Sequence, residues 1–234
     1  NYVDLAADPL GARIFLKTVW ASILVTLVTL AICYPLAFHL AFVVTRRRLR
    51  LLMLLLIVPF WINEILRTFA WQLLLAQKGL INEALLGIGL VAEPVAFTRG
   101  NAGVLIGMTY AYILFMVFPL YSAMETLDRG QVEAARDLGA RWFSVHRHIV
   151  APHARPGIAS GCIVTFMMAA GSFAVPQSLG GVDSLWFTQL FYSLFNGGYW
   201  TAGAAYEVAL EGLCLVFILA MMRLFRVGLR EIAR

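Results

Sequence analysis

Four charged side chains stand inside otherwise apolar stretches of the sequence: Glu64, Arg67, Glu207 and Glu211. A charge at membrane depth costs at least ~2.5 to 3.5 kcal/mol on insertion scales, so such groups should face a cavity or a partner. Glu64 and Arg67, three residues apart on one helical face, could neutralise each other or leave Glu64 facing a cavity. Glu207 and Glu211 repel each other and need a cation, a proton or an arginine from another subunit. The chemistry that this pattern indicates is cation binding.

Aromatic side chains lie close in sequence to these carboxylates: Trp61, Phe69, Trp71, Tyr199, Trp200 and Tyr206. Their ring faces could attract an ammonium group by ~0.5 to 2 kcal/mol each. The alternative is that they belong to an interfacial belt or to ordinary packing. The candidate lining of a solute path comprises Trp61, Glu64, Trp71, Tyr206, Glu207 and Glu211.

We find no constellation of residues that indicates catalysis or metal binding. Each of the three cysteines stands alone in an apolar run, which favours small buried side chains over a redox or metal site. His146 and His148 flank Arg147 in a polar segment, so we expect solvated side chains there. A phosphate-binding GxxxxGK[ST] loop does not occur in the sequence, which predicts that the chain does not hydrolyse ATP.

The composition is that of an integral membrane protein. Apolar residues make up 61% of the chain, charged residues only 13%, and the mean hydropathy is +0.81. The net charge of +5 does not indicate nucleic-acid binding, because the basic residues form short clusters at the ends of apolar runs.

Five apolar runs approach the roughly 20 residues that a helix needs to cross a bilayer. We expect spans at about 19–44, 51–75, 102–124, 158–175 and 204–222. A shorter, aromatic-rich run from Leu185 predicts an interfacial or re-entrant helix. Pro35, Pro59 and Pro119 fall inside the predicted spans and should kink them.

The basic residues fix the orientation expected for these spans. Three clusters would lie on one side, at residues 46–50, 129–155 and 223–234, whereas the other side has only Arg13, Lys17, Lys78 and Arg99. The positive-inside rule therefore places these clusters in the cytoplasm and the start of the chain outside. An odd number of spans with an outside start predicts an earlier span before Asn1.

The segment between the third and fourth predicted spans has the pattern of a short cytoplasmic helix pair. Asp128 is a candidate N-cap, and Gly139 a candidate helix stop. Apolar residues recur at steps of three and four, at Val132, Ala135, Leu138, Trp142, Val145 and Ile149. Such a stripe could occupy a groove on another protein, or it could lie on the lipid surface.

The stretch "EAARDLGARWFSVHRHIVAP", residues 133–152, resembles the EAA signature of ABC importer permeases. The matching positions are Glu133, Ala134, Ala135, Gly139, Ile149 and Pro152, whereas Ala151 stands where leucine is usual. In this family the loop forms a coupling helix that docks into a groove on the ATP-binding subunit. The resemblance therefore implies an anchoring role for Glu133, a turn at Gly139, and an EAA coupling loop over residues 125–157.

The likeness extends over most of the chain, from about Tyr34 to Gly203. "LLIVPFWINEILRTFAWQLLL", "KGLINEALL", "FPLYSAME" and "PGIASGCIVTFMMAAGSFAVPQSLGG" resemble spermidine/putrescine importer permeases, specifically the first permease subunit. The resemblance implies one all-α transmembrane domain over residues 1–234 with the type I importer fold, usually of six spans. Five spans would be visible here, and the sixth, N-terminal one would be absent, which agrees with the charge pattern.

The resemblance also implies a function: alternating access in a bacterial cytoplasmic (inner) membrane, driven by a separate ATP-binding subunit dimer that holds ATP and Mg²⁺. Further implied partners are a second permease subunit in a heterodimer and a periplasmic or extracellular substrate-binding protein. The acidic residues favour a polyamine over an anion. An amino-acid-like compound, ferric iron or a sugar remains an alternative, as does an ATP-independent secondary transporter, which would not explain the EAA loop.

Overall fold

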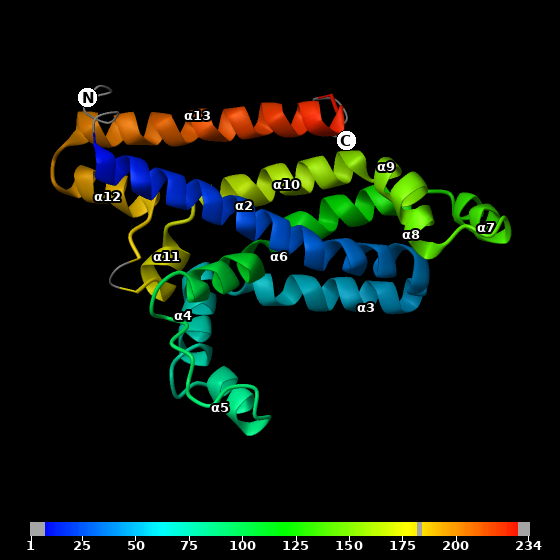
Figure 1. Ribbon diagram of the computed structural model, residues 1–234, viewed down its shortest axis with the longest axis horizontal. Helices are drawn as coiled ribbons and strands as arrows, with labels where there is room; N and C mark the ends of the chain where they lie inside the picture. Colours follow the sequence, from blue (N-terminus) through cyan, green and yellow to red (C-terminus); the bar gives the residue numbers. More distant parts are fainter. Residues whose placement is uncertain (1–7, 182–183, 229–234) are drawn as a thin grey trace.

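The computed structural model describes residues 8–181 and 184–228, and within these ranges every regular element is a helix (Figure 1). This confirms the predicted all-α class. Arg230 and Arg234, which were counted in the basic tail, lie outside the described residues.

Within the described residues, three helices are long and apolar enough to cross a membrane: α2 (Pro9–Phe38) with its continuation η1 (His39–Val43), α6 (Ala102–Glu125) and α13 (Trp200–Phe225). The first begins ten residues before the predicted start at Val19. Asp8 caps it, because its Oδ1 accepts a hydrogen bond from Leu10 N at 3.0 Å, and Pro9 occupies the first helical position. Helices α2 and α6 continue through Pro35 and Pro119.

The prediction that the second span is a single helix is wrong. It consists of α3 (Arg46–Ile57), the short 3-10 helix η2 (Val58–Trp61) and α4 (Glu64–Leu74), and the two helical parts are bent by 95°. Pro59 lacks an N–H for the helical ladder, and Asn63 starts a new helix by accepting a hydrogen bond from Ile65 N at 2.8 Å. The kink expected at Pro59 is therefore a break that redirects α4.

The fourth predicted span is shorter than expected. Helix α10 (Arg155–Ala170) has 16 residues and so a length of roughly 24 Å. It ends at Ala170 with Gly171 as its C-cap, and the predicted remainder up to Val175 belongs to a turn and to α11 (Ala174–Leu179). The aromatic run forms α12 (Phe187–Asn196), which at 10 residues is too short to span, as predicted.

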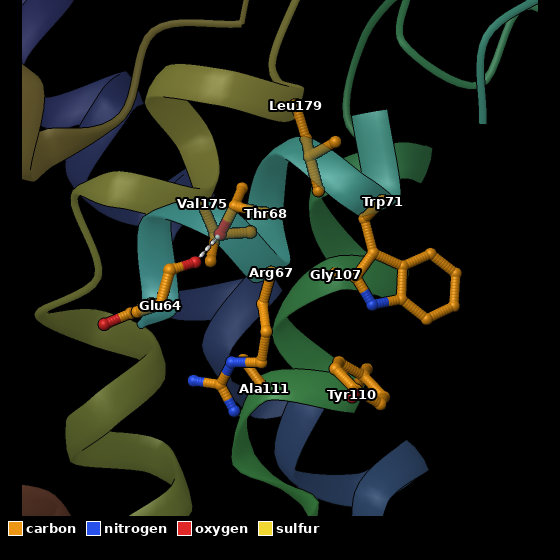
Figure 2. Close-up of a pocket in the computed structure, with 9 residues that line it drawn as sticks. All are labelled: Glu64, Arg67, Thr68, Trp71, Gly107, Tyr110, Ala111, Val175 and Leu179. Atoms are coloured by element: carbon orange, nitrogen blue, oxygen red, sulfur yellow. Dashed lines mark hydrogen bonds between the residues drawn. The ribbon is translucent and has the colours of Figure 1, made fainter. Parts of the chain in front are cut away.

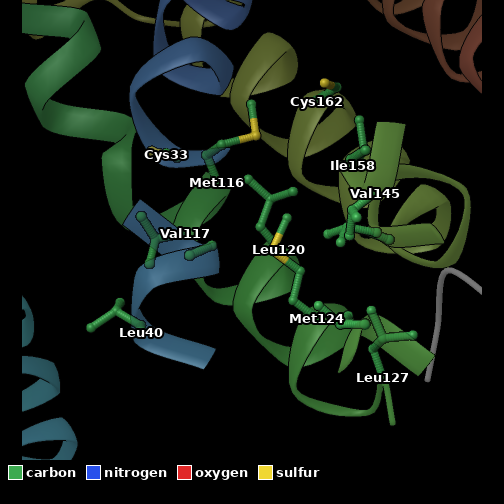
Figure 3. Packing of buried hydrophobic residues seen from close by; sticks show 14 residues of the cluster. Cys33, Leu40, Met116, Val117, Leu120, Met124, Leu127, Val145, Ile158 and Cys162 are labelled. Atoms are coloured by element: carbon green, nitrogen blue, oxygen red, sulfur yellow. The ribbon is translucent and has the colours of Figure 1, made fainter. Parts of the chain in front are cut away.

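Helix α6 is the centre of the bundle and packs against α2, α10, α4 and α11. Helix α13 packs against α10 and α12 at one edge, and α3 and α4 lie at the opposite edge (Figure 1). The largest buried group, here called the coupling-end cluster, joins α2, η1, α6 and α10 to the polar loop (Figure 3). Its members include Cys33, Leu40, Met116, Leu120, Met124, Val132, Val145, Val150 and Ile158.

The path of the chain brings the basic segments to one end of the molecule. The start of α3, the loop helices α7 (Arg129–Asp137), α8 (Trp142–Val145), η3 (His146–Val150) and α9 (Ala151–His153), and the end of α13 all lie there (Figure 1). The start of α2 and all of α12 lie at the other end. This arrangement is the one that the charge pattern predicts for the two sides of a membrane.

The segment between α4 and α6 is held by one buried amide. Asn82 on α5 (Leu80–Gly87) donates to the carbonyl oxygens of Ala76 and Val95, both at 3.0 Å, and accepts from Val95 N at 2.8 Å. Its side chain is fully buried.

We expect Asn82→Ala to lower the free energy of unfolding by about 3 kcal/mol, because three hydrogen bonds are lost and Val95 N is left unpaired. Thermal unfolding of the purified protein in detergent measures the effect, with the exposed neighbour Glu83→Ala as the control. Equal melting temperatures for the two variants would show that Asn82 does not hold this segment.

Candidate functional site

The polar loop begins and turns where the sequence predicts. Asp128 Oδ1 accepts a hydrogen bond from Gly130 N at 2.9 Å and caps α7, which ends at Asp137. Gly139 follows with φ +80°, the left-handed conformation that glycine adopts at a helix end. A side-chain Cβ at Gly139 would meet nothing within 4 Å. The backbone conformation, and not the available space, is therefore what requires glycine here.

The EAA residues fall into an exposed half and a packed half. Glu133, Ala134 and Gly139 are exposed on or just after α7, and Ala135 is half-buried. Ile149 and Pro152 are half-buried in η3 and α9, and Ile149 packs against the coupling-end cluster. The structure thus places the first half of the motif where another protein could reach it, and the second half against the bundle.

The predicted apolar stripe does not form one face. Val132 and Val145 are buried in the coupling-end cluster, whereas Leu138 is 89% exposed and Trp142 is 59% exposed. The turn at Gly139 interrupts the helical repeat, so the spacing of three and four residues does not place all six residues on one side. The outward apolar surface of the loop also includes Phe143, 70% exposed, which lies off the predicted stripe and was missed.

His146 is buried, and the expectation that it is solvated is wrong. Its Nδ1 is 3.1 Å from the Tyr34 hydroxyl oxygen. The centre of its ring lies 3.9 Å from the ring centre of Trp142 and 4.4 Å from the ring centre of Phe38. Tyr34 and Phe38 belong to α2, far away in sequence. His148 is exposed, as predicted.

Burial lowers the pKa of His146 below its ordinary value of 6.5, and the positive charge of Arg136 lowers it further. The folded protein therefore binds fewer protons at this group than the unfolded chain. The stabilisation by neutral His146 should be complete above about pH 6.5 and lost as the pH falls through the lowered pKa.

We expect His146→Gln to remove part of the acid-induced fall in melting temperature, whereas His148→Gln should not. Identical pH profiles for both variants and the wild type would contradict this.

A second candidate site is a groove of about 460 Å³ beside α4, α6 and α10. Glu64 and Arg67 line it, together with Phe60, Tyr112, Phe118 and Met168. The Arg67 guanidinium lies over the Phe60 ring, 4.5 Å from its centre, and Nη1 has no hydrogen-bond partner among the described residues. Figure 2 shows the Glu64 carboxylate pointing away from this guanidinium. The two charges do not pair, so Glu64 remains available to another cation.

Aromatic rings form a wall next to this groove. Trp71 lies 5.2 Å from Tyr110, ring centre to ring centre (Figure 2), and Tyr110 lies 5.7 Å from Phe60. Trp61 is 86% exposed. Sequence reasoning missed Tyr110 because it stands in an apolar run without a neighbouring charge.

The residues predicted to line one path fall into two groups. Trp61, Glu64 and Trp71 lie on or beside α4, whereas Tyr206, Glu207 and Glu211 lie on α13 at the opposite edge of the bundle (Figure 1). Glu207 and Glu211 are exposed. The Tyr206 hydroxyl donates to Asp8 Oδ2 at 2.9 Å, which ties α13 to the start of α2. Within the described residues, the chain does not bring the two groups together.

Residues 10–227 match a known family, described as "Binding-protein-dependent transport system inner membrane component". The chain belongs to this family. It is therefore a multi-pass inner-membrane component of an ABC transport system, as the EAA resemblance implies. Relatives that carry the name "Spermidine/putrescine transport system permease protein PotB" match along the chain. This permease is 36% identical to the protein of Salmonella typhimurium, over 100% of its own chain and 82% of that protein. It is also 36% identical to the protein of Escherichia coli, over 97% of its own chain and 82% of that protein. The protein of Haemophilus influenzae is 34% identical over 95% of this chain and 78% of its own.

Solved structures of ABC importers share the fold of this permease. A bacterial transporter for the acidic polysaccharide alginate matches with a TM-score of 0.74 and 17% identity, over 96% of this chain and 82% of that chain. The MetNI methionine transporter in an inward-facing conformation matches with a TM-score of 0.64 and 18% identity, over 94% of this chain and 98% of that chain. These likenesses show the fold predicted from the sequence, that of a type I importer transmembrane domain.

Proposed function

We propose that this permease provides the membrane path for a polyamine such as spermidine or putrescine in an ATP-driven importer. The observation that carries the proposal is the 36% identity to the PotB proteins along the whole chain. The unpaired Glu64 supports it, because a carboxylate free of Arg67 can attract an ammonium group. Phe60, Tyr110 and Trp71 offer ring faces nearby, although Phe60 already carries the Arg67 guanidinium.

The partners that we propose are those that membership of the family implies. An ATP-binding subunit dimer holds ATP and Mg²⁺ and docks on the coupling loop, residues 125–157, while this chain contributes no ATPase site of its own. A periplasmic substrate-binding protein delivers the solute. The exposed Glu133 and the outward surface formed by Leu138, Trp142 and Phe143 suit the docking role. Nucleotide-driven closure of the dimer would move the loop and reorient the bundle.

A second permease subunit completes the path in this proposal. Helix α13 carries Glu207 and Glu211 on its exposed side, among exposed apolar residues such as Val208 and Leu215. Carboxylates at membrane depth do not face lipid chains at low cost, so this side suits a water-filled cavity shared with the partner. The two groups of predicted path residues would then line different parts of one route.

Uptake by cells tests the proposal. A host without its own polyamine importers should accumulate radiolabelled spermidine when it expresses this permease with its cognate partners. Excess putrescine should compete, whereas sulfate, a sugar and ferric citrate should not. No accumulation of spermidine above the background of the host would overturn the polyamine proposal while leaving the membership of the family intact.

A further inference from the structure

Two π-helical segments lie at the coupling end of the bundle. Segment η1 ends α2 and closes with a bond from Val44 N to His39 O at 3.1 Å. Segment η3 lies in the coupling loop, and its cap amide at Ala151 bonds to His146 O. Such i to i+5 turns are rare and occur frequently at functional sites. Buried Leu40 of η1 and Val150 of η3 belong to the same coupling-end cluster.

The first polar contact between the coupling loop and the end of α2 with η1 comes from Arg129, the first residue of α7. Its Nη2 donates to the carbonyl oxygen of Ala41, inside η1, at 2.8 Å. Its guanidinium also lies 6.0 Å from the centre of the Phe42 ring. A charged donor makes a stronger hydrogen bond than a neutral one, and here it joins segments 88 residues apart.

The second contact comes from His146, the first residue of η3. The hydrogen bond to Tyr34 and the ring contact with Phe38 both reach α2, where these residues are one turn apart. The ring of Trp142 on α8 also packs against the imidazole, 3.9 Å from centre to centre. Besides the apolar cluster, the loop therefore makes hydrogen bonds and ring contacts with the cytoplasmic end of α2 and with η1 at two places, one through α7 and one through η3.

We propose that these two contacts form a clamp that makes the cytoplasmic end of α2 move with the coupling loop. Helices α6 and α10 follow the loop because they are joined to it in the chain, whereas α2 has no such connection. Helix α7 packs on α8 and extends from the bundle (Figure 1). The apolar coupling-end cluster also joins the loop to α2, and the two contacts add directional polar and ring interactions to it. Arg129, Tyr34 and His146 are thus positioning residues for ATP-driven transport, which rests on the proposed function.

Variants of the clamp test its effect on transport. Arg129→Gln with Tyr34→Phe should still co-purify with the ATP-binding subunits, but lower uptake and substrate-stimulated hydrolysis about tenfold. Arg129→Lys should restore most of the uptake, because a cationic donor is retained. Arg48→Gln removes one exposed arginine of α3 and serves as the matched control. Uptake at the wild-type rate by the double variant would overturn the proposal.

Spin-label distances test the clamp without any solute. Labels at Val43, 60% exposed at the end of η1, and at Arg147, exposed on η3, would be placed in a transport-competent background lacking the three native cysteines. In the assembled complex the distance should be the same without nucleotide and with trapped ATP, and it should change or broaden in Arg129→Gln with Tyr34→Phe. A distance that changes with nucleotide in the unmodified clamp would overturn the proposal. Because this readout needs no polyamine, failure of the substrate assignment would not affect it.

Discussion

Gly139→Pro is expected to abolish uptake, with a decrease of more than about a hundredfold. Proline fixes φ near −65°, whereas Gly139 has φ +80°, so the turn between α7 and α8 cannot form with proline at this position. The exposed half of the EAA motif would then point elsewhere relative to the half that packs on the bundle. Uptake and substrate-stimulated ATP hydrolysis measure the effect, and labelling of the membrane fraction verifies insertion.

Gly139→Asn is the matched control for this prediction. Asparagine tolerates the left-handed conformation better than other side chains, and a Cβ meets nothing within 4 Å. We expect uptake within about twofold of the wild type. Glu133→Arg, which reverses an exposed charge of the loop, should abolish uptake as Gly139→Pro does. Normal transport by Gly139→Pro or by Glu133→Arg would refute the coupling role assigned to the loop.

Glu207→Gln combined with Glu211→Gln should lower polyamine uptake on the order of a hundredfold, and each single change less. Each carboxylate that contacts an ammonium group contributes roughly 1.5 to 3 kcal/mol, and the amide keeps the shape without the charge. Co-purification with the ATP-binding subunit checks that the complex still assembles.

Glu83→Gln on α5 removes an exposed carboxylate away from α13 and is the control for charge loss alone. Wild-type uptake by the Glu207 and Glu211 double variant would place both carboxylates off the cation path. The polyamine proposal would then depend on the likeness to PotB and on Glu64.

The start and turn of the coupling loop could be predicted because their signals are local. Asp128 bonds to an amide two residues away, and the left-handed turn at Gly139 is set by its own backbone. Neither depends on distant parts of the chain. The long apolar helices were equally accessible, since hydropathy over about 20 residues is enough to indicate them.

The break between α3 and α4 could not be placed from hydropathy, because the apolar run continues across it. Pro59 predicted a kink, but the 95° bend also requires Asn63 to start a new helix. The burial of His146 was missed for a different reason. Its partner Tyr34 is 112 residues away, and no local pattern indicates such a contact.

The grouping of the path residues was equally beyond the sequence. Glu64 and Glu207 looked alike, since both are carboxylates beside aromatic residues. Their separation follows from the order in which the helices pack, with α2, α6 and α10 between α4 and α13 (Figure 1). The Arg67 guanidinium lies over the ring of Phe60, which precedes the helix break, and no local pattern indicated this contact.

Transport by the purified complex in proteoliposomes tests the central claim most directly. Wild-type permease, reconstituted with its ATP-binding, second permease and binding-protein partners, should accumulate spermidine only when ATP and Mg²⁺ reach the ATP-binding subunits. The complex carrying Gly139→Pro should retain basal ATP hydrolysis and accumulate none. Accumulation of spermidine without ATP, or equal accumulation by the wild type and the proline variant, would contradict ATP-driven polyamine import through this coupling loop.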